Sequence, residues 1–279
     1  MLQRRKMMAN AQGQIDNPLD AAVRKRDRSA VQMATEAVKH NQCMLAFQPV
    51  MQAQPPHQRA FYEGFIRVLD ETGRVIPARE FMPAVENTEI GRELDCNALQ
   101  IGLRTLTRNP TIRLSINMSA RSIGFKKWTQ ILHRFLKKDP TLGERLILEI
   151  NETSVMTVPE LVIDFMDQLQ EHGIAFALDD FGAGNIAMRL FREFFFDAAK
   201  IDGQFIRGIN KNPDNQAVVR ALIAIAREFD MFTIAESVET VEEAEFLVEH
   251  GVDCLQGFLF GAPTVKPDWA QPEQEKSTA

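Results

Sequence analysis

The chain has 279 residues, of which 45% are hydrophobic and 25% are charged, so it can form a sizeable globular core. Its 32 basic and 38 acidic residues give a formal net charge of −6, which argues against binding to a nucleic-acid polymer. Cys43, Cys96 and Cys254 are too few and too widely spaced for a disulfide framework or a zinc knuckle. A reducing compartment fits best, and we expect a cytoplasmic protein without a membrane span.

The N-terminal segment MLQRRKMMANAQGQ is basic but lacks the apolar run of a signal peptide, so it predicts a flexible tail. Asn17 and Pro18 are typical of a helix start, and an amphipathic helix is expected to follow with a projecting first half. We expect the tail and N-terminal helix to occupy residues 1–28, the folded domain residues 29–267, and a disordered polar tail residues 268–279.

From Met44 onward, short apolar segments of strand length alternate with helical patterns. Such alternation predicts βαβ units, and eight strands over about 220 residues fit a (β/α)8 TIM barrel. The predicted strands are residues 44–50, 60–68, 112–118, 145–151, 174–180, 196–202, 232–237 and 252–258, and the predicted helices include Pro159–His172, Asn215–Phe229 and Val241–His250.

The connection between the first two strands, MQAQPPHQRA, is short, contains two prolines and has no helical pattern. Parallel neighbours need a crossover of about a dozen residues or more. The first strand is therefore expected to run antiparallel to the second. The predicted fold class is α/β, a modified TIM barrel with its first strand antiparallel.

Polar side chains collect at the C-terminal ends of the predicted strands, which form the active-site rim of a TIM barrel. Glu63 and Arg67 share one face of the second strand, because residues an even number apart point the same way. Ala175 and Ala177 share a face with Asp179 and leave room beside its carboxylate. The further strand-end residues are Asn117, Glu149, Glu152, Asp180, Lys200, Asp202, Glu236, Glu239 and Gln256.

Several carboxylates on one rim repel one another at low dielectric unless a cation lies among them. Carboxylate and carboxamide oxygens, with no histidine at a strand end, favour magnesium, manganese or calcium over zinc. The nearby Lys200 and Arg67 suit phosphoryl chemistry, in which Lys200 orients a water or stabilises developing charge. The residues therefore predict a metal-dependent phosphodiesterase site.

Structural roles remain open for part of this set. Glu63 and Glu149 lie within apolar strands, where an unpaired charge is costly, so a purely structural role is least expected for them. The residues that could instead be turn formers, helix caps, loop anchors or first-turn acids are Asp180, Asp202, Gln256 and Glu239.

The motifs FQPV, EGFIR, PAREFMPAVE, INMSAR, LEINET, ALDDFGAG, AKID, IAESVET and LQGF, with a later Pro263, stand in this order along the chain. From about Ser29 to Pro267 they resemble the EAL-type cyclic di-GMP phosphodiesterases. The resemblance implies the modified TIM barrel and hydrolysis of cyclic di-GMP to the linear dinucleotide pGpG with magnesium or manganese at a two-metal site. Calcium, which accepts a looser shell, is expected to inhibit.

The resemblance also assigns roles to residues of this sequence. Lys200 matches the lysine that holds the nucleophilic water, and Glu152 matches the glutamate that steadies the loop after Asp179 and Asp180. The expected catalytic residues are Lys200, Glu152 and Glu239. The expected metal ligands are Glu63, Asn117, Glu149, Asp179, Asp180 and Glu236. The expected substrate-binding residues are Gln48, Arg67, Asp202 and Gln256.

Three motifs depart from the family pattern: the signature tripeptide is Glu63-Gly64-Phe65, the loop reads DDFGAGNIAMRL instead of DDFGTGYSSL, and AEGVE is AESVE. Three hypotheses follow: a working phosphodiesterase, a receptor that binds cyclic di-GMP without turnover, or a scaffold that acts by protein contact alone. The retained ligands favour the first, and the altered loop and Phe65 favour the others. The family's loop contacts lead us to expect a homodimer, but the sequence indicates no regulatory partner.

Overall fold

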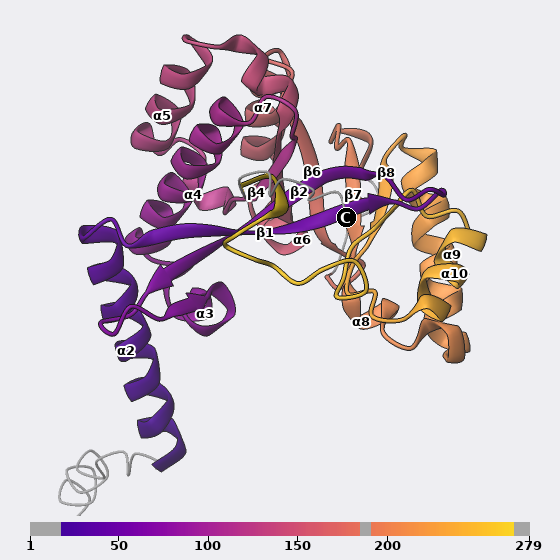
Figure 1. The fold of residues 1–279 in the computed structure, drawn as a ribbon, viewed down its shortest axis with the longest axis horizontal. Helices are drawn as coiled ribbons and strands as arrows, with labels where there is room; N and C mark the ends of the chain where they lie inside the picture. The colour runs from indigo at the N-terminus through magenta and orange to yellow at the C-terminus, as the bar shows by residue number, and fades with distance from the viewer. Residues whose placement is uncertain (1–17, 185–190, 271–279) are drawn as a thin grey trace, which may run out of the picture.

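The computed structural model describes residues 18–184 and 191–270, which form a closed barrel of strands surrounded by helices (Figure 1). The strand order is β1-β9-β8-β7-β6-β5-β4-β2-β3, and an additional pairing of β1 with β2 closes the barrel. The short β3 pairs only with β2 and lies outside the closed ring. The expected modified TIM barrel is confirmed.

The eight barrel strands correspond to the eight predicted ones. They are β1 (Cys43–Gln52), β2 (Arg59–Leu69), β4 (Leu114–Asn117), β5 (Leu146–Asn151), β6 (Ala175–Phe181), β7 (Ala198–Ile201), β8 (Phe232–Ala235) and β9 (Cys254–Leu255). The last is much shorter than predicted because the chain leaves the sheet at Gln256, whose carbonyl oxygen accepts from Val238 N at 3.0 Å. The hairpin strand β3 (Val75–Pro77) is not predicted from the sequence.

The first strand is antiparallel to its neighbours on both sides, as expected from its short connection. The remaining barrel pairings, from β2–β4 round to β8–β9, are parallel. The antiparallel register sets Gln48 of β1 directly opposite Glu63 of β2. Two polar side chains from the N-terminal hairpin are thereby placed on adjacent strands.

Helices cover the outside of the barrel, with α4, α5 and α7 on one side and α9 and α10 on the other (Figure 1). The helix bounds are α2 (Pro18–Lys39), α3 (Met82–Val85), α4 (Glu89–Arg108), α5 (Lys126–Leu136), α6 (Glu152–Thr157), α7 (Pro159–Gln170), α8 (Gly203–Ile206), α9 (Pro213–Glu228) and α10 (Val241–Glu249). Thr240 and Glu243 form a capping box at the start of α10. Among the described residues, no helix combines the length and the hydrophobicity needed to cross a membrane.

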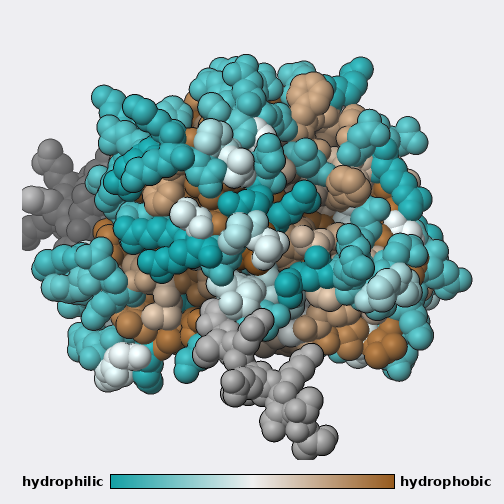
Figure 2. Space-filling view, turned by 45° about the horizontal axis from the view of Figure 1, so that its top comes forward, coloured by the Kyte–Doolittle hydropathy of each residue, from teal (hydrophilic) through white to brown (hydrophobic). Residues whose placement is uncertain are grey.

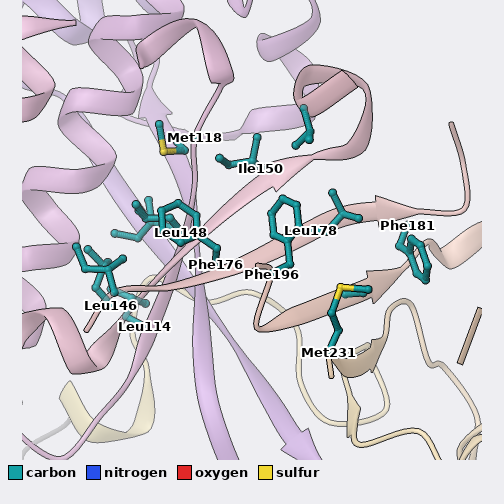
Figure 3. Close-up of a cluster of buried hydrophobic side chains, with 14 of the residues drawn as sticks. Leu114, Met118, Leu146, Leu148, Ile150, Phe176, Leu178, Phe181, Phe196 and Met231 are labelled. Carbon is teal, nitrogen blue, oxygen red and sulfur yellow. The ribbon is translucent and has the colours of Figure 1, made fainter. Parts of the chain in front are cut away.

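The main core lies between the strands and these helices. Figure 3 shows Leu146, Leu148 and Ile150 of β5 within this layer, where all three are buried. Side chains of a strand alternate between its two faces, so Glu149, between Leu148 and Ile150, faces the barrel interior. On the outer surface, Figure 2 shows hydrophilic side chains over most of the face that it draws, with apolar ones between them.

The N-terminal helix α2 is anchored at one end. Ala30, Ala34 and Ala37 are buried against a small cluster that includes Val68 and Phe81, and the other half of the helix projects from the barrel (Figure 1). The projection agrees with its weakly apolar first half. The expected tail and the Asn17 cap lie in residues 1–17, outside the described part.

The first residues of the expected C-terminal tail form ordered structure against the barrel. Asp268–Ala270 form a short 3-10 helix, in which Trp269 lies edge-on to Phe47 and Tyr62 with ring centroids 5.1 Å and 5.9 Å apart. The Asp268 carboxylate accepts a hydrogen bond from the Tyr62 hydroxyl. The predicted disorder from residue 268 is therefore wrong for these three residues, because they find aromatic and polar partners on the barrel. Residues 271–279 lie outside the described part.

Candidate metal and substrate site

The side chain of Lys200 lies at the centre of a cluster of carboxylates contributed by different barrel strands. Lys200 belongs to β7, between the buried Ala199 and Ile201, and only 1% of its side chain is exposed. Strand alternation directs its neighbours to the core and Lys200 into the barrel. Its Nζ lies 2.9 Å from Glu63 Oε2, 2.8 Å from Glu149 Oε2, 3.2 Å from Asp179 Oδ1 and 2.7 Å from Glu236 Oε1.

Glu63 is fixed by amide groups as well as by the lysine. Asn117 Nδ2 donates to Glu63 Oε1 at 2.7 Å, and Gln256 Nε2 donates to Glu63 Oε2 at 2.7 Å. Gln256 Nε2 also donates to Gln48 Oε1 at 3.2 Å. Burial alone would raise the pKa of Glu63, but Lys200 and these amide donors hold it below its usual value. Glu63 is therefore an ionised carboxylate in a fixed position.

Asp179 and Asp180 reach the rim together because β6 is irregular at this point. The β6–β7 register shifts between Leu178 and Phe181, and Asp180 has a left-handed φ of 57°. Adjacent residues of a regular strand point to opposite faces, whereas a bulge redirects them. One oxygen each from Asp179, Asp180 and Glu236 lie within 4.8 Å of one another, as metal ligands would. The Asp180 carbonyl oxygen also accepts from Ala183 N, so its expected turn role coexists with the site role.

The carboxylates outnumber the positive charge that Lys200 supplies. Burial raises the pKa of Glu149 well above its usual value, and neighbouring Glu63 adds to the shift. Burial, with Asp179 nearby, raises the pKa of Glu236 to about 8. Burial would lower the pKa of Lys200, but the surrounding carboxylates raise it well above its usual value. The cluster thus keeps its lysine charged and favours any added positive charge.

Two buried carboxylate oxygens of the cluster around Lys200 lack hydrogen-bond donors. Within the described part of the chain, Glu149 Oε1 and Asp179 Oδ1 make no hydrogen bond, although the latter lies near Lys200. Buried polar atoms are normally satisfied, so these oxygens suit a ligand that accepts lone pairs. The donor set is entirely carboxylate and amide oxygen, which fits a hard divalent cation.

Glu152 holds the loop that follows β6. Its Oε2 accepts from Gly182 N at 3.0 Å, and a Cβ at Gly184 would lie 2.4 Å from its Oε1. Gly182 has a φ of 93°, which residues with a side chain rarely adopt. Glu152 therefore lies where the loop-steadying role was predicted. The next loop residues, 185–190, lie outside the described part, so their expected dimer contacts cannot be placed.

The cluster opens into a cleft of about 310 Å³ that is lined by Gln48, Arg67, Glu236, Glu239 and Gln256 among others. A second cleft, of about 640 Å³, is lined by Asn117, Asp179 and Asp180. Residues of the candidate site therefore line both clefts.

Asp202 and Glu239 flank the central cluster. Asp202 caps α8, with its Oδ1 accepting from Gln204 N at 2.6 Å. Its carboxyl group also lies beside that of Asp180 and, after burial and the charge of Asp179, helps to raise the pKa of Asp180 to about 6. The capping alternative is therefore confirmed for Asp202, which at the same time lies beside the predicted metal ligand Asp180. Glu239 precedes Thr240, the N-cap of α10, so its first-turn alternative is wrong. Its Oε1 lies 3.6 Å from Arg207 Nε.

Sequence reasoning missed two arginines of the 310 Å³ cleft, Arg79 and Arg207. Arg79 belongs to the PAREF segment that carried part of the family resemblance, so its motif offered a signal. Arg207 directly follows α8, six residues beyond the end of β7 at Ile201, and no motif indicated it.

Comparison with known proteins identifies the family. The EAL domain model matches residues 31–263. The cyclic di-GMP phosphodiesterase PdeB of Shewanella oneidensis is 27% identical over 238 residues, which cover 84% of this chain and 28% of PdeB. The chain thus spans less than a third of the length of that relative.

Solved structures agree with this result. The PaMucR phosphodiesterase in complex with c-di-GMP superposes with a TM-score of 0.74 at 26% identity, covering 85% of this chain and 97% of that one. The calcium and cyclic di-GMP complex of Klebsiella pneumoniae BlrP1 superposes with a TM-score of 0.69 at 25% identity, covering 80% and 56%. The sequence resemblance is confirmed, and the chain belongs to the EAL domain family of cyclic di-GMP phosphodiesterases.

Proposed function

We propose that this chain hydrolyses one phosphodiester bond of cyclic di-GMP and releases the linear dinucleotide pGpG. One observation carries the proposal: a fully buried lysine is surrounded by four carboxylates at the barrel rim, two of which keep a buried oxygen without a donor. A purely structural cluster gains nothing from such unsatisfied oxygens. The EAL relatives supply the substrate class.

Magnesium or manganese fits the oxygen donors better than zinc. When bound, such ions neutralise phosphoryl charge and lower the pKa of water. The residues proposed to hold two ions are Glu63, Asn117, Glu149, Asp179, Asp180 and Glu236. Asn117 and Gln256 donate hydrogen bonds to Glu63, so the carboxylate of this proposed ligand is held in a fixed orientation.

Lys200 performs the part that the protein contributes directly. Its ammonium has three N–H donors and lies within reach of every carboxylate of the cluster. It can exchange one of these contacts for a water or for the developing oxyanion. Arg67, which lines the cleft, supplies a guanidinium for the phosphate groups. Glu152 keeps the loop after β6 in place.

A receptor that binds cyclic di-GMP without turnover is the second candidate. Phe65 favours it, because this residue replaces the leucine of the family's signature and lines the substrate cleft. A bulkier aromatic ring there can shift the ligand relative to Lys200, and small displacements of reacting groups are costly in rate.

The deciding experiment incubates the purified chain with cyclic di-GMP in magnesium, in manganese and in chelator, and measures pGpG by chromatography and ligand binding by calorimetry. Metal-dependent pGpG formation supports the phosphodiesterase. Saturable binding without product identifies the receptor. If neither pGpG formation nor ligand binding is observed, the phosphodiesterase and the receptor are both refuted, and the protein-contact scaffold is the hypothesis that is left.

A cytoplasmic location and a homodimer complete the proposal. All three cysteines are free in the structure, which suits a reducing compartment. Fractionation of cells and sedimentation of the purified chain test the location and the oligomeric state respectively.

A further inference from the structure

Ser237, directly after Glu236, adopts a backbone conformation that is unfavourable for its residue type. Its φ is 57°, in the left-handed region where a Cβ is crowded. The family motif has glycine at this position, whereas this chain has AESVE. A side chain retained in a strained conformation suggests a use for that side chain.

The Ser237 hydroxyl contacts an arginine of the substrate cleft. Arg207 Nη2 donates to Ser237 Oγ at 3.0 Å, and Arg207 Nε lies 3.6 Å from Glu239 Oε1. Gly203 provides the space, because a Cβ there would lie 2.3 Å from Ser237 Oγ. The residues at positions 203, 207, 237 and 239 therefore fit one another as a unit that orients the guanidinium.

This arrangement leaves part of the Arg207 guanidinium free to donate hydrogen bonds to a ligand. Nε and Nη2 face Glu239 and Ser237, while Nη1 makes no hydrogen bond within residues 18–184 and 191–270. The Arg207 side chain is 60% exposed and lines the 310 Å³ cleft, so a ligand can reach it. Phe65, Phe258 and Pro263 line the same cleft and offer apolar surfaces for a planar base.

Building on the function proposed above, we propose that Arg207, oriented by Ser237 and Glu239, determines specificity by binding the O6 and N7 edge of one guanine. Guanine presents two acceptors on this edge, which match two N–H donors of an arginine fork. Adenine places an amino donor where guanine has O6, so it would meet Arg207 with a donor against a donor. The structure thus assigns to Arg207 the discrimination between cyclic di-GMP and cyclic di-AMP.

The test measures dissociation constants for both cyclic dinucleotides by calorimetry in chelator, so that no turnover intervenes. We expect Arg207→Ala to weaken cyclic di-GMP binding roughly tenfold or more and to leave cyclic di-AMP binding nearly unchanged. Arg207→Lys should behave similarly, because lysine keeps the charge but lacks the planar fork. Arg220→Ala on α9 is the matched control for loss of an exposed arginine.

Ser237 provides a second, independent measurement. Ser237→Gly removes the strained Cβ and the hydroxyl, so the melting temperature should hold or rise while the preference for cyclic di-GMP falls. Ser237→Ala keeps the strain and should lose the same preference. A loss of binding with a lower melting temperature in Ser237→Gly would contradict this reasoning.

The outcomes separate the two proposals. If the wild type binds cyclic di-GMP and Arg207→Ala keeps its preference over cyclic di-AMP, the specificity role is refuted and the phosphodiesterase stands. If Arg207→Ala weakens the binding of cyclic di-GMP and cyclic di-AMP equally, the proposal that Arg207 binds the guanine edge is also refuted. Equal weakening indicates that Arg207 contacts a phosphate, which both ligands share. If the wild type binds neither dinucleotide, both proposals fail together.

Discussion

Lys200→Ala removes the ammonium group that four carboxylates share. Glu63 is buried and ionised, so the variant leaves its charge without this partner. Removing one member of a buried ion pair costs about 3–5 kcal/mol. Each kcal/mol shifts the melting temperature of a domain of this size by about 2–4 °C, so the metal-free variant should melt roughly 6–20 °C lower.

The metal-loaded variant should behave differently. Bound manganese restores positive charge among the carboxylates, so most of the lost melting temperature should return. The rate should not return, because an oriented donor acting on water or oxyanion contributes about 10²-fold or more. Ligand affinity should change little, since an interaction made mainly in the transition state appears in the rate.

The assay combines three measurements on the wild type, Lys200→Ala and the exposed-surface control Lys138→Ala. Melting temperature is recorded in chelator and in manganese, the dissociation constant by calorimetry, and turnover as pGpG formed. Normal turnover in Lys200→Ala would refute the catalytic role. Loss of fold and binding that manganese does not restore would show that Lys200 is a structural residue.

Three further predictions follow from the same structure. Glu63→Ala and Asp179→Ala should each abolish pGpG formation even at saturating manganese, because each removes a carboxylate from the cluster; near-normal rates would refute the ligand assignment. Calcium should inhibit where magnesium or manganese activates, and faster hydrolysis in calcium than in magnesium would contradict this. Burial raises the pKa of Asp95 from its usual 3.8 to about 7, so the folded state holds a proton there that the unfolded chain releases. Stability should fall by about 2–3 kcal/mol as pH rises from 5 to 8, and urea unfolding of Asp95→Asn should show a flatter profile.

The sequence predicted the residues whose position follows from strand alternation. Glu149 lies between Leu148 and Ile150, so an apolar outer face required it to point inward. Glu63 followed from the same reasoning, and the antiparallel first strand followed from the length of one connection. The inward position of these two glutamates and the direction of the first strand depend on the residue pattern within one short segment, which can be read from the sequence.

Other features depend on contacts that no local pattern encodes. The bulge that brings Asp179 and Asp180 to one side is a register shift against β7, so it depends on a second strand. The packing of Trp269 on Phe47 and Tyr62 joins segments far apart in the chain. Arg207 and Ser237 meet in the cleft through a hydrogen bond, and the sequence does not indicate the left-handed conformation of Ser237.

Two departures from the family pattern, Phe65 and Ser237, can be placed in the structure, and their positions indicate whether ligand recognition or metal binding has changed. Phe65 and Ser237 both line the 310 Å³ cleft, whereas the carboxylates around Lys200 and the amides that orient Glu63 are all present. Ligand recognition depends on the shape and donors of the cleft, while metal binding depends on the oxygen set. Substitutions that line the cleft alter affinity or base preference before they alter metal binding, whereas the altered loop after Asp180 bears on the rate and regulation. Divergence at these two positions therefore argues for altered recognition of the proposed dinucleotide, whereas the carboxylates proposed to hold the metal are all present.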